Sequence, residues 1–352
     1  MIIMPVRTIG IIGAGSIVFK SHLPLLTALG FDVRWVLDSV LARAKAAAVA
    51  FKVPMFLGAD ELAAAPHTDL VLVACPYGGR QPYFEFLRGR ECAIYIEKPV
   101  ARSVGELESI CQLRPDYAVA AGFLRRSMGV TNMVKDIIAD ELFGRLRRVR
   151  SEFGTATIIS AGAGFAKNVE LAGGGQLFES AIHNVDAVCF MADVQSAIVT
   201  RCMMEHEDGF DLHTDAQLTL TDSKGQDFEF ELLVTCLHNT SYEIEMHFEH
   251  AILTFSLFRP MRPQVRVTQG KRSYQLTDPL LQDSPSGSFD VNHVFLTDFL
   301  KGLETQTPNY TNACATRATA HIMEQIYERG TKADVQLFAR SGDAFAGAGR
   351  IG

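Results

Sequence analysis

Apolar residues in the first third of the chain come in short runs, and amphipathic segments separate them. The runs are rich in β-branched residues and have the length of buried strands. We expect strands at Thr8–Ile12, Val33–Leu37, Val53–Phe56, Asp69–Ala74, Cys92–Ile96 and Tyr117–Ala121. The segments between them predict a helix that ends at Leu29 and helices at Val40–Phe51, Ala59–Ala65, Arg80–Arg88 and Val104–Cys111. This alternation predicts a doubly wound, mainly parallel sheet with right-handed crossovers.

The pattern changes from about Arg145 onward, where apolar and polar residues mostly alternate along longer segments. We expect strands at Leu146–Phe153, Ala197–His206, Ala216–Thr221, Gln226–Leu237, Tyr242–Phe248, Ile252–Phe258 and Gln264–Thr268, then helices at Val291–Leu303 and Asn312–Glu328. Alternation of this kind is typical of an antiparallel sheet with one buried face. The chain is therefore expected to combine a doubly wound α/β domain, residues 1–122, with an α+β domain, residues 123–345, built on a mainly antiparallel sheet.

Length and charge narrow the possible partners. The 352 residues suggest about two domains. The net charge of −7 and the pI of about 5.8 give no reason to expect a nucleic acid. The seven cysteines are scattered without a Cys-x-x-Cys pair, so we expect no disulfide framework or zinc knuckle, and a reducing cytoplasm. No apolar run has the length of a membrane span, and Met1–Pro5 lacks the features of a signal peptide.

A glycine turn follows the first predicted strand. Gly13 and Gly15, followed by Ser16 and Ile17, would let the backbone turn tightly and bring helix-terminal amides to a pyrophosphate. Val18 stands where the third glycine of the dinucleotide fingerprint belongs. The second strand ends at Asp38, 23 residues beyond Gly15, where a carboxylate would accept hydrogen bonds from the adenosine ribose. This carboxylate favours NAD over NADP, although Asp38 could also cap the helix Val40–Phe51.

Two further strand ends carry polar groups that a buried strand would not carry. Pro76 and Tyr77 follow one strand, and Glu97 and Lys98 follow the next, just before Pro99. Carboxyl ends of parallel strands meet at the ligand-binding edge of a doubly wound sheet, so we expect these residues beside the cofactor. Tyr77 is expected to pack on the adenine or ribose, or else to be an ordinary loop aromatic. Glu97 is expected to hold Lys98 or to be solvated.

The second domain contains one segment with a different composition. Gly173-Gly174-Gly175 opens Gln176–Met191, which predicts a single helix. Glu179 and His183 lie four residues apart and therefore share a face of this helix. A carboxylate that orients an imidazole is typical of a general base, and glycines allow close approach to a ligand. The alternative is a satisfied core histidine.

The three motifs together resemble the Gfo/Idh/MocA oxidoreductases, the family of glucose–fructose oxidoreductase and inositol dehydrogenase. They are Gly-x-Gly-x-Ile, Glu-Lys-Pro, and Gly-Gly-x-Leu-x-Glu-x-x-x-His-x-x-Asp. The resemblance implies a Rossmann domain followed by a domain with an open antiparallel sheet. It also implies hydride transfer between NAD(P) and a carbon of a sugar, cyclitol or related hydroxyl compound.

The resemblance further implies roles for single residues. Lys98 would lie near the reacting hydroxyl, His183 would be the general acid/base, and Arg126 or its neighbour Arg125 would contact the substrate. The chain departs from the family pattern at three positions: Glu179 replaces an aspartate, Arg80 a histidine, and Ala181 a glycine. Arg80 could add an anion-binding group, and for Arg80 and the two later arginines the alternative is a surface charge.

We therefore expect an NAD-dependent oxidoreductase for a sugar or polyol, with Lys98, His183 and Glu179 as catalytic residues and no metal. One alternative uses bound NAD transiently to assist elimination or hydrolysis of a sugar, and another is a non-catalytic dinucleotide-binding regulator. His247-x-x-His250 lacks a third metal ligand. The resemblance allows a homodimer or homotetramer that packs through the second sheet. The expected outer face of this sheet is polar, so the sequence does not decide the oligomeric state.

Overall fold

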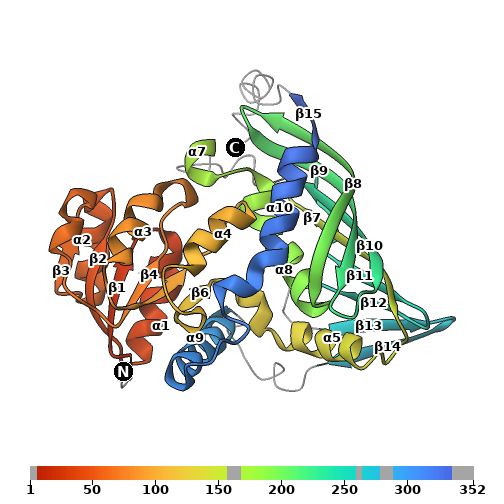
Figure 1. Ribbon diagram of the computed structural model, residues 1–352, viewed down its shortest axis with the longest axis horizontal. Helices are drawn as coiled ribbons and strands as arrows, with labels where there is room; N and C mark the ends of the chain where they lie inside the picture. Colours follow the sequence, from red (N-terminus) through yellow and green to blue (C-terminus); the bar gives the residue numbers. More distant parts are fainter. Residues whose placement is uncertain (1–5, 157–167, 259–263, 278–287, 335–352) are drawn as a thin grey trace, which may run out of the picture.

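A computed structural model describes residues 6–156, 168–258, 264–277 and 288–334 (Figure 1). Within these residues the first sheet has six strands in the order β3-β2-β1-β4-β5-β6, and every neighbouring pair is parallel. The strands are β1 (Thr8–Ile12), β2 (Asp32–Leu37), β3 (Met55–Leu57), β4 (Leu70–Val73), β5 (Ala93–Ile96) and β6 (Val119–Ala121). The strand order reverses between β1 and β4, which is the switch point where doubly wound sheets bind ligands.

Helices cover both faces of this sheet. They are the π-helical turn η1 (Val18–His22), α1 (Leu23–Ala28), α2 (Leu41–Phe51), α3 (Gln81–Arg88) and α4 (Val104–Cys111), with 3₁₀ turns η2 (Ala59–Ala64), η3 (Tyr77–Gly79) and η4 (Asp116–Ala118). Burial on both faces explains why β4 and β5 are apolar at every position. The predicted Rossmann topology is confirmed, and most element ends agree with the prediction to within one or two residues.

The second sheet is larger. Among the described residues it has nine strands in the order β14-β13-β12-β11-β7-β10-β9-β8-β15. The strands are β7 (Leu146–Gly154), β8 (Val194–Glu207), β9 (Phe210–Asp222), β10 (Asp227–Thr235), β11 (Ile244–Phe248), β12 (Ile252–Phe255), β13 (Gln264–Gln269), β14 (Arg272–Thr277) and β15 (Thr331–Asp334). Neighbours are antiparallel except for the pairs β7–β10 and β8–β15. The predicted open, mainly antiparallel sheet is therefore confirmed, although β14 and β15 were not predicted, because they lack a clear apolar alternation.

The helices of this second part are α5 (Gly129–Ala139), α7 (Val169–Ala172), α8 (Ile182–Met191), α9 (Ser288–Thr305) and α10 (Arg317–Arg329), with turns η5 (Leu124–Ser127), η7 (Leu177–Ala181) and η9 (Ala313–Thr316). The π-helical turn η7 runs directly into α8, so the predicted helix Gln176–Met191 is one helical segment. The helix α5 was not predicted.

Helix α9 lies next to the first sheet, although it belongs to the carboxyl-terminal part of the sequence (Figure 1). Phe295 and Phe299 of α9 pack edge-on against Tyr95 of β5, with ring centroids 5.6 and 6.4 Å apart. Both phenylalanines are fully buried in the same apolar cluster as β1 and α1. The order of elements along the chain therefore does not separate the two sheets into independent units.

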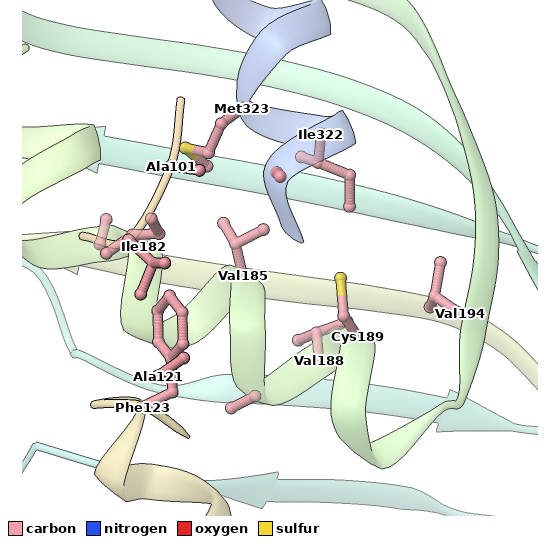
Figure 2. Close-up of a cluster of buried hydrophobic side chains, with 14 of the residues drawn as sticks. Ala101, Ala121, Phe123, Ile182, Val185, Val188, Cys189, Val194, Ile322 and Met323 are labelled. Atoms are coloured by element: carbon pink, nitrogen blue, oxygen red, sulfur yellow. The ribbon is translucent and has the colours of Figure 1, made fainter. Parts of the chain in front are cut away.

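Helix α8 forms the apolar seam between the two sheets. Figure 2 shows Val185 and Val188 of α8 in one cluster with Phe123, which follows β6, and with Ile322 of α10. All four side chains are buried. This packing fixes α8, and with it the helical segment that carries Glu179 and His183, against the carboxyl ends of the parallel strands.

A disulfide also joins the two parts. Cys111, at the end of α4, is bonded to Cys314 in η9, with Cα atoms 5.8 Å apart and a sequence separation of 203 residues. This disulfide was not predicted, because the scattered cysteines gave no reason to expect a disulfide framework. Sequence spacing could not reveal it, because proximity here depends on the tertiary fold. Among the helices of the described residues, none is long and apolar enough to cross a membrane.

Candidate active site

The turn after β1 is open to a ligand. Gly13 has φ +100°, and a Cβ at this position would lie 2.7 Å from the carbonyl carbon of Ala74, so only glycine fits. A Cβ on Gly15 would meet no atom within 4 Å. The next residues, Ser16 and Ile17, are exposed and begin a helical run whose amino terminus has no side-chain cap. Uncapped amides beside open space fit the pyrophosphate of a dinucleotide.

Asp38 closes this turn from the end of β2. One carboxylate oxygen accepts a hydrogen bond from the amide of Ala14 at 2.7 Å, and the other accepts from the amide of Val40 at 2.8 Å. The bond to Val40 closes a turn just before α2, but no side chain caps α2, whose N-cap is Val40, so the alternative role of Asp38 as a helix cap is not observed. Each oxygen keeps a second lone pair, so a hydrogen bond from a ribose hydroxyl is compatible with this geometry.

Glu97 is buried, so the expectation of a solvated strand end is wrong. Its carboxylate accepts from Nε2 of His22 in η1 at 2.6 Å and from the backbone amide of Lys98 at 3.2 Å. Burial raises the pKa of Glu97, but the hydrogen bond and charge of His22, with the charges of Lys98 and Arg80, lower it overall. Glu97 thereby connects the end of β5 to the helix that follows the glycine turn.

Arg80 is neither a surface charge nor an open anion-binding group, so both expectations are wrong. Its guanidinium is buried and donates to the backbone carbonyl oxygens of Cys75 and Pro99. These bonds connect the loops that follow β4 and β5. Arg80 therefore supports the strand ends from within the protein.

Pro76 and Tyr77 follow β4, and Tyr77 faces the second part of the molecule. Its hydroxyl donates to Glu106 of α4 at 2.6 Å, and its ring packs edge-on against Phe178 of η7 with centroids 5.0 Å apart. A Cβ on Gly173 would lie 2.4 Å from this ring, which explains the glycine there. Neither the expected stacking of Tyr77 on a cofactor nor the loop-aromatic alternative included this contact with Phe178.

Lys98 extends across the seam between the two sheets. Its Nζ donates to the backbone carbonyl oxygen of Glu179 at 2.7 Å and to the Glu179 carboxylate at 3.2 Å. The peptide bond between Lys98 and Pro99 is cis. The structure therefore brings Lys98 to the helical segment of His183, as predicted, but it pairs Glu179 with Lys98.

His183 does not have the partner that the helical spacing predicted. Its Nδ1 is buried and has no hydrogen-bond partner in the described part of the chain, so a Glu179–His183 dyad is not formed. The ring packs edge-on against Phe123 with centroids 6.2 Å apart. Burial lowers the pKa of His183 well below its ordinary value, and the charges of Arg125 and Lys98 lower it further. His183 is thus a neutral imidazole close to two cations.

Arg126 is a structural residue, which corrects its expected contact with substrate. Its guanidinium is 2% exposed and makes two bonds to the carboxylate of Asp186, at 2.8 and 2.7 Å. It also donates to the carbonyl oxygens of Tyr310 and Ala315. Four of the five N–H donors of this guanidinium are therefore used by groups of the protein. The neighbouring Arg125 is the arginine that lies near His183.

Asp211 is a functional candidate that the sequence analysis missed. Its buried carboxylate accepts from the amides of Gly175 and Leu177 at 2.5 and 2.7 Å, and from the hydroxyl of Tyr327 at 2.7 Å. Burial raises the pKa of Asp211, and these hydrogen bonds oppose that effect. A Cβ on Gly175 would lie 2.3 Å from the carbonyl oxygen of Asp211. The triple glycine therefore allows close packing against β9 and α10. Its expected approach to a ligand remains a prediction.

Metal-binding groupings are absent from the described residues, where no three His, Cys, Asp or Glu side chains are placed to hold an ion. His247 instead lies beside Glu245 on β11.

Comparisons with known proteins agree with this fold. Residues 7–121 match the family model GFO_IDH_MocA, described as an oxidoreductase family with an NAD-binding Rossmann fold. No curated protein sequence matches the chain.

Several solved structures share the fold over nearly the whole chain. One is KijD10, a 3-ketoreductase from Actinomadura kijaniata in complex with NADP and TDP-benzene. It has 16% identity and a TM-score of 0.79, and the match covers 94% of this chain and 99% of that one. Another is an aldose–aldose oxidoreductase from Caulobacter crescentus complexed with glycerol (14%, TM-score 0.75, 96% and 98% covered). A third is a levoglucosan dehydrogenase in complex with NADH and L-sorbose (18%, TM-score 0.75, 92% and 96% covered).

The fold and the matched segment define the class, an oxidoreductase with an NAD(P)-binding Rossmann fold. The match of residues 7–121 to this family model confirms the resemblance to the Gfo/Idh/MocA oxidoreductases that was drawn from the motifs.

Proposed function

We propose that this protein is an NAD-dependent dehydrogenase or reductase that acts on a hydroxyl-bearing carbon of a sugar, cyclitol or related polyol. The observation that carries the proposal is the reach of Lys98 from β5 to the helical segment of His183, where its Nζ lies 2.7 Å from the Glu179 carbonyl oxygen. A lysine and a neutral histidine, both suited to proton transfer, would then border one space at the carboxyl ends of the parallel strands.

The cofactor would be held by residues of the first sheet. The glycine turn, with Gly13, Gly15, Ser16 and Ile17, would bind the pyrophosphate, and Asp38 would accept hydrogen bonds from the ribose. The carboxylate of Asp38 supports NAD over NADP, because it would repel a 2′-phosphate. Pro76, Tyr77, Glu97 and Lys98 would border the cofactor at the strand ends. When bound, the nicotinamide supplies the hydride acceptor for oxidation or the donor for reduction.

His183 would take the proton from the substrate hydroxyl in the oxidative direction and return it in the reductive direction. Its lowered pKa keeps the imidazole neutral at pH 7, which is the form that accepts a proton. Lys98 would donate a hydrogen bond to the same oxygen and stabilise the negative charge that develops there. Glu179 would position Lys98 through its two contacts with the ammonium group.

A sugar or polyol as substrate is supported by the solved structures of similar fold. They include an aldose–aldose oxidoreductase complexed with glycerol and a levoglucosan dehydrogenase complexed with L-sorbose. A homodimer or homotetramer stays a prediction. The exposed face of the second sheet carries cross-strand ion pairs such as Arg148–Glu231 and Arg201–Asp215.

Substitution of the two proposed acid/base residues tests the function. We expect Lys98→Met and His183→Asn each to lower kcat by about 10²- to 10⁴-fold, the usual contribution of a positioned acid or base. The dissociation constant of NAD should change little, because the glycine turn and Asp38 are intact. Turnover is measured as NADH absorbance with a panel of sugars and polyols, and NAD affinity by calorimetry.

Lys224→Met is a matched control, because Lys224 is an exposed lysine paired with Glu141. It should retain the wild-type rate. If both site variants turned over the best substrate at the wild-type rate, the proposed function of these residues would be wrong.

A further inference from the structure

Arg125 is a half-buried cation whose hydrogen-bonding capacity is only partly used. It lies in η5, just after β6, and its guanidinium stacks on the ring of Phe258 at 3.5 Å from the centroid. One terminal nitrogen donates to the carbonyl oxygen of Leu257. Its Nε is buried and has no hydrogen-bond partner within the described ranges. A guanidinium normally satisfies all its buried donors, so this arrangement is incomplete without another acceptor.

The charge of Arg125 is also uncompensated. No carboxylate of the described residues forms an ion pair with it, whereas the next residue, Arg126, is held by both oxygens of Asp186. Burial lowers the pKa of Arg125 to about 9, and no nearby anion opposes this effect. Removing a cation from water is costly unless an anion pairs with it. Arg126 thus has a carboxylate partner and Arg125 has none among the described residues, which leaves Arg125 able to bind an anion.

Arg125 lies on the substrate side of the proposed active site. Its charge and that of Lys98 both act on His183, and Phe123, two residues before Arg125, packs against the ring of His183. The ammonium of Lys98 has Glu179 as its counter-ion. The unbalanced positive charge beside His183 therefore comes from Arg125.

We propose that the substrate of this enzyme carries an anionic group, foremost the carboxylate of a sugar acid, and that Arg125 binds it. The proposal rests on the proposed function and adds the class of substrate. The Nε of Arg125 and the terminal nitrogen on the same edge form a two-donor fork that matches the two oxygens of a carboxylate. Stacking on Phe258 holds the plane of this fork, which makes Arg125 a specificity-determining residue.

An anion on Arg125 would also change the general base. The negative charge would offset the field of Arg125 at His183 and raise the basicity of the imidazole once substrate is bound. A neutral sugar would leave that field in place. Binding and proton transfer would therefore both favour the acid over the matching neutral sugar.

Matched pairs of ligands test the proposal on the NAD-saturated protein. The probes are glucose, glucuronate and glucose 6-phosphate, with the corresponding galactose and mannose series to allow for stereochemistry. We expect at least one sugar acid to raise Tm and to have a higher kcat/KM than its neutral partner. Arg125→Gln should lower kcat/KM for that acid by at least about 30-fold, as for truncating one side of a buried charge pair. At a pH above the acidic limb of the profile, it should change kcat/KM for the neutral sugar by less than about threefold.

Two further variants keep this test decisive. Arg125→Lys retains the charge without the fork and should give an intermediate loss for the acid. Arg147→Gln, on an exposed arginine of β7 that pairs with Glu249, should match the wild type. A preference for sugar phosphates that depends on Arg125 would assign the anion to phosphate instead of carboxylate.

Equal kcat/KM for neutral and anionic partners, with equal effects of Arg125→Gln on both, would overturn the anionic substrate and leave the proposed function standing. Failure of every anion to raise Tm of the NAD-bound protein would also overturn it. Absence of NADH formation with every compound, while anions still stabilise the wild type but not Arg125→Gln, would contradict the proposed function and leave the anion site standing.

Discussion

At the scale of single residues, the candidate site depends on the environment of each charge more than on its position in the sequence. Lys98 and Arg125 are cations of similar depth, but Lys98 has Glu179 as partner and Arg125 has no carboxylate partner among the described residues. His183 lies close to both, so its pKa is lowered by burial first and then by their charges. These surroundings make the imidazole neutral, which is the property that the proposed mechanism needs.

The lowered pKa of His183 gives a pH prediction. His183 must be neutral to accept a proton, so activity should fall only as pH drops through its lowered pKa in the free enzyme, well below 6.5. Arg125→Gln removes one of the two cations that lower this pKa, so the acidic limb of kcat/KM should move to higher pH. Lys98 and the Glu179 carboxylate that pairs with it remain in place.

The measurement is kcat/KM for a neutral sugar between pH 4.5 and 9, in wild type and Arg125→Gln. Arg147→Gln serves as the control and should keep the wild-type profile. A limb that stays unchanged in Arg125→Gln would mean that His183 is not the group that titrates.

Single residues also mark the limit of what the sequence could predict. The spacing of Glu179 and His183 placed them on one helical face, but it could not show that Lys98, from the other sheet, would take Glu179 as partner. Arg125 and Arg126 are adjacent and chemically identical, so only the fold reveals that Asp186 binds the second and not the first. His22 was not predicted as the partner of Glu97 for the same reason, since it reaches Glu97 through the tertiary fold.

At the scale of elements, the spacing of apolar residues predicted those strands and helices whose burial pattern is regular along the sequence. The buried strands of the first sheet and the alternating strands of the second were recognisable because period-two and all-apolar patterns are local properties. β14 and β15 were missed, since they contain few apolar residues. α5 was missed although its buried residues Val130, Val134 and Ile137 have the spacing of one helical face. The element at the centre of the site, η7 and α8, was predicted as a helix, but its anchor on Asp211 was not.

The anchor of η7 gives the next prediction. Asp211→Asn removes one of two acceptors for the amides of Gly175 and Leu177, and Tyr327→Phe removes only the tyrosine hydroxyl bond. We expect Asp211→Asn to lower kcat by about tenfold or more, because small displacements of a catalytic group can cost about 10²-fold. Tyr327→Phe should have a smaller effect in the same direction.

NAD affinity should be nearly unchanged in both variants, which separates a positioning role from general destabilisation. Calorimetric titration with NAD, together with steady-state rates, gives this comparison. A loss of NAD affinity as large as the loss of kcat would argue that Asp211 supports the whole fold and not the position of His183 alone.

At the scale of the whole molecule, the two sheets are held together by connections that are distant in sequence. Helix α9 packs on the first sheet, α8 fills the seam, and the Cys111–Cys314 disulfide links α4 to η9. The expected division at residue 122 describes the order of the elements along the chain. The packing of α9 shows that the carboxyl-terminal part also completes the first core.

The disulfide gives a prediction at this scale. It closes a loop of 203 residues, so its reduction should destabilise the protein, typically by about 2–4 kcal/mol. We expect Cys314→Ser, and the wild type under reductant, to show a lower free energy of unfolding in denaturant titrations. Cys202→Ser is the control, because Cys202 is a buried free thiol. Equal stability of oxidised and reduced wild-type protein would contradict this account.

The central claim is that Lys98 and His183 act on the same oxygen of the substrate. A crystal structure of the protein with NAD and its preferred sugar or sugar acid tests this most directly. The account predicts one hydroxyl oxygen within about 3.2 Å of both Lys98 Nζ and a ring nitrogen of His183, beside the nicotinamide. A substrate that contacts only one of these residues, or binds away from the nicotinamide, would contradict it.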